Sequence, residues 1–159
     1  MAENAEQITP VVVKRLREWN PRAAESLAEF RGEVTVVVPA GLLRAAAARL
    51  RDDSTLAFNF LSDLTCVDRF PLEPRFELQY HLTSIPRRER VRLRVRLSGT
   101  DSTVDSVTSV WPGANWMERE VFDLFGVRFQ GHPDLRRILL PGDWEGHPLR
   151  RASPVAGFR

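Results

Sequence analysis

Two neighbouring segments alternate strictly between apolar and polar residues, and this pattern constrains the fold more than any other feature. Residues 75–84 alternate aromatic and leucine side chains with polar ones, and residues 90–97 alternate arginine with valine and leucine. Successive side chains of a β-strand point to opposite faces, so each segment predicts a strand with one buried and one polar face. Pro86 and the charged residues around it predict the turn of a hairpin.

Helical periodicity and β-branched runs predict the other elements. In chain order they are a helix over 10–30 broken at Pro21, a strand at 33–38, a helix at 42–53, a strand at 56–61, a bend at 62–68 and helices at 103–110 and 114–125. Helices on one face of a hairpin-containing sheet indicate an α+β fold, a two-layer sandwich of helices on a mostly antiparallel sheet.

The residues after Gly126 differ in composition from the rest of the chain. Gly126 stands where a glycine commonly ends a helix. Beyond it the chain is rich in glycine, proline, arginine and aromatic residues. Such a segment cannot bury itself in a core of its own, and long loops of this kind usually carry function or dock on a partner. We therefore predict a compact domain over 1–126 and an extended C-terminal arm over 127–159 that docks on a partner.

Composition excludes several classes of protein. The chain has 159 residues, of which 43% are hydrophobic, enough for a core. It contains no apolar run near 18 residues and no signal-peptide pattern, which predicts a cytoplasmic location. Its single cysteine, Cys66, excludes an internal disulfide and a self-contained iron–sulfur or zinc–cysteine site. We expect Cys66 to be a small buried side chain.

The expected helix 114–125 is charged on the sides away from its apolar stripe. The stripe would consist of Met117, Val121, Leu124 and Phe125, and the charged residues are Glu118, Arg119, Glu120 and Asp123. Three acids on one helix, together with a histidine, could serve a small metal-dependent hydrolase. Because no ligand motif accompanies them, ion pairs within the helix or to a partner are the better explanation.

Two further patterns invite a binding hypothesis. The tripeptide Gly-His-Pro occurs at 131–133 and at 146–148, and we expect both turns to present their imidazoles for hydrogen bonding rather than for a metal. Arg92, Arg94 and Arg96 line one face of the hairpin. Aromatic residues do not separate these arginines, so a protein-docking or solvated face is favoured over nucleic-acid binding.

The segment from Ala114 to Arg151 resembles the signature of one family, the 30-kDa or C subunit of respiratory complex I (NADH:quinone oxidoreductase). The matching runs are ANWMERE from Ala114, DLFGV from Asp123, FQGHPDLRRIL from Phe129 and PGDWEGHPLRR from Pro141. The resemblance implies a compact α+β domain whose arm wraps the D subunit of the complex. That neighbour helps to form the quinone pocket and lies close to the iron–sulfur subunits.

The resemblance also implies that this chain contributes no catalytic residue, cofactor or metal site. NADH, FMN, iron–sulfur clusters and quinone would be bound by other subunits, and the protein would lie on the cytoplasmic side of the plasma membrane, attached only through the complex. Photosynthetic-type complexes and membrane-bound energy-converting hydrogenases use similar short subunits, so they stay open as alternatives. The resemblance implies docking and assembly roles for Trp116, Glu118, Arg119, Glu120, Asp123, Gly126, Gly131, His132, Pro133, Asp134, Arg136, Arg137, His147, Pro148 and Arg150.

Overall fold

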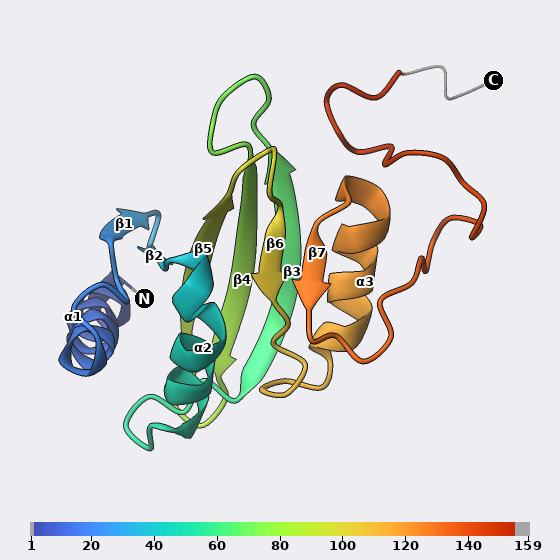
Figure 1. The fold of residues 1–159 in the computed structure, drawn as a ribbon. Helices are drawn as coiled ribbons and strands as arrows, with labels where there is room; N and C mark the ends of the chain where they lie inside the picture. The colour runs from blue at the N-terminus through green and yellow to red at the C-terminus, as the bar shows by residue number, and fades with distance from the viewer. Residues whose placement is uncertain (1, 155–159) are drawn as a thin grey trace.

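A five-stranded mixed sheet forms the centre of the protein (Figure 1). The computed structural model describes residues 2–154. The elements are α1 (Ala2–Trp19), β1 (Ser26–Phe30), β2 (Glu33–Val37), the 3-10 helix η1 (Ala40–Leu42), α2 (Leu43–Asp52), β3 (Phe60–Asp68), β4 (Phe76–Ser84), β5 (Glu89–Leu97), β6 (Thr103–Asp105), α3 (Ala114–Phe125) and β7 (Arg128–Gln130). The predicted α+β class and the helix-on-sheet arrangement are confirmed.

The sheet has the strand order β1-β2-β5-β4-β3 and is antiparallel except where β2 runs parallel to β5. The predicted hairpin is the β4–β5 pair, in which Leu78 lies opposite Val95 and Tyr80 opposite Leu93. These apolar side chains point to the face covered by α2, whose own apolar residues are buried there: Leu43, Ala46, Ala47 and Leu50. The apolar residues of the strands and those of the helices thus pack together in a single core.

The second half of the predicted helix 10–30 is wrong, because that segment forms β1. After α1, the side chain of Asn20 accepts a hydrogen bond from the backbone N–H of Arg22 at 3.0 Å, which favours a turn over a new helical start. The chain then pairs with β2 through a two-residue turn. Arg31 and Gly32 both have positive φ there, 53° and 78°, as tight hairpin turns require.

Two other predictions also missed strands. The segment 62–68, expected as a bend, continues β3, in which a register shift between Leu61 and Asp63 interrupts the alternation of side chains. The segment 103–110, expected as a helix, contains β6, which pairs in parallel with β7. In the second case the deciding partner is distant in sequence, and local periodicity does not report such pairing.

The boundary of the compact domain also needs correction. Val127 and Phe129, placed in the arm by the sequence, are buried in the core at 0% and 2% exposure. The β7 strand ends at Gln130, so the extended segment begins at Gly131. From there the chain runs along α3, as Figure 1 shows in orange and red. Among the described residues no helix is long and apolar enough to cross a membrane.

Candidate functional site

Helix α3 buries three of its charged residues, whereas its first aromatic residue is exposed. Glu118 and Asp123 are fully buried and Arg119 is 8% exposed, whereas Trp116 is 62% exposed. Of the predicted apolar stripe, Val121 is buried but the other three residues are partly exposed. The predicted stripe is thus borne out at Val121, and Met117 and Phe125 pack partly buried against the core. The charged side is buried as well, because the arm binds Asp123 and the β6 region binds Glu118.

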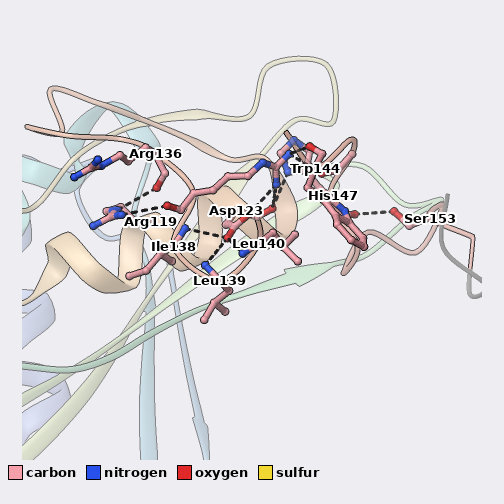
Figure 2. A network of polar contacts seen from close by, with 11 residues as sticks. Arg119, Asp123, Arg136, Ile138, Leu139, Leu140, Trp144, His147 and Ser153 are labelled. Atoms are coloured by element: carbon pink, nitrogen blue, oxygen red, sulfur yellow. Dashed lines mark hydrogen bonds and ion pairs between the residues drawn. The ribbon is translucent and has the colours of Figure 1, made fainter. Parts of the chain in front are cut away.

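Asp123 is the main attachment point of the arm (Figure 2). Its Oδ2 accepts hydrogen bonds from the backbone N–H groups of Ile138, Leu139 and Leu140 at 3.1, 2.8 and 2.9 Å. Its Oδ1 accepts one from Arg137 Nη1 at 2.7 Å. Burial opposes ionisation, but these four donors outweigh it and lower the pKa of Asp123. The carboxylate therefore stays charged and fastens one turn of the arm to the helix.

Two arginines extend this attachment along the arm. Arg137 Nη2 donates to the carbonyl oxygens of Trp144 and Gly146, both at 2.9 Å. Arg119 donates from Nε to the carbonyl of Arg136 at 3.0 Å and from Nη2 to that of Arg137 at 3.1 Å. Loop carbonyls that would otherwise need water are thus satisfied by guanidinium groups. Ion pairs were predicted within the helix or with a partner, whereas Asp123 pairs with Arg137 at 2.7 Å and so joins the helix to its own arm.

The first Gly-His-Pro turn attaches the arm near the start of α3. Gly131 has a φ of 81° and turns the chain after β7. His132 Nδ1 accepts the backbone N–H of Asp134 at 3.0 Å, so the proton of the neutral ring lies on Nε2. Nε2 then donates to the carbonyl of Asn115 at 3.1 Å. The predicted role of this imidazole in hydrogen bonding is confirmed.

The second Gly-His-Pro turn attaches the arm near the end of α3. His147 Nδ1 donates to the backbone carbonyl of Asp123 at 2.9 Å, and its ring lies edge-on to Phe122 at 6.3 Å. Burial lowers the pKa of His147, which favours the neutral ring. The Ser153 hydroxyl donates to the carbonyl of His147 at 2.7 Å. The two repeats therefore hold the arm at both ends of one helix.

Gly126 ends α3 in the left-handed region, with a φ of 76° and its N–H bonded to the Phe122 carbonyl at 2.9 Å. The predicted helix-ending role of Gly126 is confirmed. A Cβ at this position would lie 2.5 Å from Arg150 Nη2 and 2.6 Å from the His147 ring. Arg150 in turn donates from Nε to the Phe125 carbonyl at 2.6 Å. Glycine is thus needed both for the backbone and for the approach of the arm.

Replacing Gly126 with alanine is expected to destabilise the protein and to displace the end of the arm. The left-handed backbone alone costs a residue with a Cβ roughly 1–2 kcal/mol, and the clash with Arg150 adds to it. Urea unfolding measures the loss. Gly142→Ala is the control, since a Cβ there meets nothing within 4 Å. Equal stability of the two variants would contradict this account.

Glu118 lies in a separate buried pocket between α3 and the β6 region. Its Oε2 accepts the Ser106 hydroxyl at 2.7 Å and its Oε1 accepts the Val107 N–H at 2.7 Å. His132 Nε2 is 3.9 Å away, but its proton is directed to a carbonyl. Burial raises the pKa of Glu118 to about 7, against the two hydrogen bonds that lower it. Burial and the charge of Glu118 also raise the pKa of the enclosed Tyr80.

Comparison with known proteins shows the family to which this chain belongs, and the match includes the arm. Residues 36–159 match the family described as the respiratory-chain NADH dehydrogenase 30 Kd subunit. This chain belongs to that family. It is 50% identical over 144 residues to the C subunit of NADH-quinone oxidoreductase from Roseiflexus sp. (strain RS-1), covering 91% of this chain and 83% of the relative. The same subunit of Geobacter sulfurreducens is 43% identical over 158 residues, covering 99% and 93%.

Solved structures of two relatives share the fold of this 30-kDa-subunit family member. The trypsin-resistant fragment (1–134) of Nqo5 superposes with a TM-score of 0.60 at 32% identity, over 78% of this chain and 99% of the fragment. A chain of the membrane-bound sulfane sulfur reductase, an archaeal respiratory membrane complex, superposes with a TM-score of 0.72 at 26% identity, over 88% and 82%. The chain is thus a subunit of the respiratory-complex type.

The structure divides the residues singled out by the family resemblance into two groups. Those that meet on or against α3 are Glu118, Arg119, Asp123, Gly126, His132, Arg137, His147 and Arg150. Those that are exposed are Trp116, Glu120, Gly131, Pro133, Asp134, Arg136 and Pro148. Sequence reasoning missed Ser106 and Tyr80, because only the fold brings them to Glu118, and missed the backbone N–H groups that bind Asp123.

The acidic residues of α3 do not converge on one point. The carboxylates of Glu118 and Asp123 bind different donors on different segments, and Glu120 is exposed. Among the side chains that the structure describes, those of residues 11–154, no group of three or more His, Cys, Asp or Glu could hold a metal ion. Cys66 is buried as predicted, and burial raises the pKa of its thiol to about 12, which disfavours a thiolate nucleophile.

Proposed function

We propose that this chain is a non-catalytic structural and assembly subunit in the hydrophilic arm of a proton-translocating NADH:quinone oxidoreductase. The observation that carries the proposal is the organisation of the C-terminal arm. Its backbone is fastened to α3 through Asp123, while Leu139, Trp144 and Leu149 remain 62%, 40% and 52% exposed. Large apolar side chains held outward on a fixed segment are typical of an interface that a partner covers.

The partner we propose for this surface is the D subunit of the complex, which is its quinone-site subunit, next to the iron–sulfur subunits. The relatives are named as subunits of NADH-quinone oxidoreductase, which supports an origin in the same kind of complex. The Nqo5 fragment is described as trypsin-resistant, which supports a compact domain that is separable from the arm. In Figure 2 Leu139 points away from the network around Asp123, as a side chain available to a partner would.

We propose further that this chain binds no redox group itself and that NADH, FMN, iron–sulfur clusters and quinone are bound by other subunits. In support, Arg119 and Asp123 of α3 and His147 of the arm are engaged in hydrogen bonds between the helix and the arm. The protein would lie on the cytoplasmic face of the membrane, attached through the complex. A second candidate is the equivalent subunit of a respiratory membrane complex with another electron donor or acceptor, favoured by the likeness to the sulfane sulfur reductase.

Leu139→Ser is expected to weaken assembly with the quinone-site subunit while leaving the isolated chain folded. Losing a buried leucine contact costs roughly 1.5–3 kcal/mol, or about ten-fold or more in affinity. Co-expression with that subunit followed by native gel and affinity measurement provides the readout. The matched control is Ile85→Ser in the β4–β5 turn, because Ile85 is 60% exposed against 62% for Leu139. Equal assembly of both variants would sink the proposal.

A further inference from the structure

The face of the sheet opposite the core carries a concentration of arginine that the proposed role of the arm does not use. In β4 and β5 the residues that point away from the core lie opposite each other, with Glu77 facing Arg96, Gln79 facing Arg94 and His81 facing Arg92. Figure 1 shows α2, α3 and the β6–β7 pair on the other side of β3, β4 and β5. The face therefore lacks a covering helix from these elements. The arm reaches its edge, where the Arg151 N–H donates to Asp68 at 2.9 Å beside Arg69.

One buried carboxylate on this face has three arginine partners. Glu77 lies 3.0 Å from Arg94 Nε, 3.7 Å from Arg96 Nε and 3.7 Å from Arg69 Nη1. It is only 7% exposed, because the arginine side chains that surround it cover it. A single carboxylate neutralises one guanidinium, so this cluster keeps an excess of positive charge on a half-buried surface.

The hydrogen-bonding capacity of the face is also incompletely used. Gln79 donates to Glu77 at 2.6 Å, but its Oε1 is buried and has no partner among the described residues. The same is true of Arg92 Nε and of Arg94 Nε, which lies near Glu77 without the alignment of a hydrogen bond. Buried polar atoms without partners cost free energy in the isolated chain.

A hollow of about 620 Å³ lies at one end of the face. Its polar lining includes Arg31, Glu33, Asp63, His81, Arg90 and Arg92. Burial and the charge of Arg92 lower the pKa of His81, so its imidazole adds no charge near neutral pH. The hollow therefore provides a recess beside the arginine cluster, with positive and negative groups placed close to each other.

We infer that this open sheet face is a second docking surface, which takes an acidic segment of a partner protein. Arginines on the face outnumber carboxylates, and guanidinium groups pair with carboxylates in a planar, bidentate manner. The interspersed acids Glu33, Asp63 and Glu77 would repel a continuous phosphate backbone. A protein segment can instead place separate carboxylates over Arg94 and Arg96 and a basic or neutral residue over the acids.

Binding of fluorescein-labelled poly-L-glutamate to the full chain, followed by anisotropy at low salt, tests the charge complementarity. The double variant Arg94→Gln/Arg96→Gln is expected to weaken binding by about ten-fold. The control Arg87→Gln/Arg88→Gln removes the same charge from the β4–β5 turn and is expected to change binding by less than about two-fold. An equal loss in both variants, or tighter binding of poly(U) RNA than of polyglutamate, would overturn the inference.

A single substitution tests whether weaker binding arises from the lost charge rather than from loss of folding. Arg96 is 41% exposed, so Arg96→Gln alone is expected to keep the wild-type circular dichroism and still weaken polyglutamate binding by several-fold. In the purified complex, a photo-crosslinking residue at position 96 is expected to label a segment of a neighbouring protein rich in aspartate and glutamate. Absence of any cross-link, or labelling of a segment without acidic residues, would contradict the inference, whatever the arm binds.

Discussion

Asp123→Asn is expected to release the arm from α3 and to lower the free energy of unfolding by about 3–5 kcal/mol. The carboxylate is fully buried and accepts four hydrogen bonds, three of them from successive backbone N–H groups of the arm. An amide at this position replaces one acceptor oxygen with an NH₂ group that faces other donors. Either Arg137 or the backbone N–H groups then lose their partner inside the protein.

Limited trypsin digestion and urea unfolding measure this effect. Cleavage of the Asp123→Asn variant is expected within 131–154 at a trypsin concentration that leaves the wild type intact. Asp134→Asn is the matched control, because Asp134 pairs with Arg136 on the surface, with 52% and 73% of the side chains exposed, where such pairs contribute little. If the two variants were equally resistant, Asp123 would not be the attachment point.

The pH dependence of Asp123 has a defined sign. Its pKa is lowered in the folded protein, so its contribution to stability is complete above the ordinary carboxyl range. That contribution is lost as the pH falls through the folded pKa, because protonation then removes the charge that binds Arg137. The arm of the isolated chain is therefore expected to loosen in acid. This acid effect is expected to be smaller in the Asp123→Asn variant, which has already lost the charge.

Glu118→Gln is expected to stabilise the protein at alkaline pH, by up to about 3 kcal/mol. Burial raises the pKa of Glu118 from 4.5 to about 7, so between these values the folded protein binds more protons than the unfolded chain. Stability must then fall as the pH rises through this interval, and the loss is complete once the pH has passed the folded pKa. Glutamine removes the charge, retains the acceptor for the Val107 N–H and can donate to Ser106.

Urea unfolding of the wild type and of Glu118→Gln between pH 5 and 9 isolates the contribution of the Glu118 charge, since all other groups titrate alike in the two proteins. The difference in unfolding free energy is expected to be small at pH 5 and to grow in favour of the glutamine variant toward pH 8. Glu120→Gln serves as the control, because Glu120 lies on the exposed side of the same helix. A difference that is constant across this range would show that Glu118 does not carry the buried charge.

Much of the architecture was predictable from local pattern. The alternation in β4 and β5, the apolar face of α2 and the glycine that ends α3 each act through the backbone period of the element that contains them. Strand β6 was not predictable because its partner β7 is distant in sequence, and the 62–68 part of β3 was missed because a register shift interrupts its alternation. Strand β1 was missed although its partner β2 follows directly, because its segment was taken as the continuation of a helix. The family resemblance singled out α3 and the arm. It did not show that the charged residues of α3 would be buried, because the groups that bind them come from other segments.

Local sequence pattern was thus enough to locate the strands and helices of regular period, the glycine that ends α3 and the signature of the arm. The hydrogen-bond partners and the ionisation of the charged residues in that signature are decided only in the folded protein. Asp123 and Glu118 look alike on the helix, yet one accepts four donors and stays charged while the other is buried with two and holds its proton near neutral pH. The charge of a carboxyl group depends on the donors around it, and here those donors come from segments that meet only in the fold.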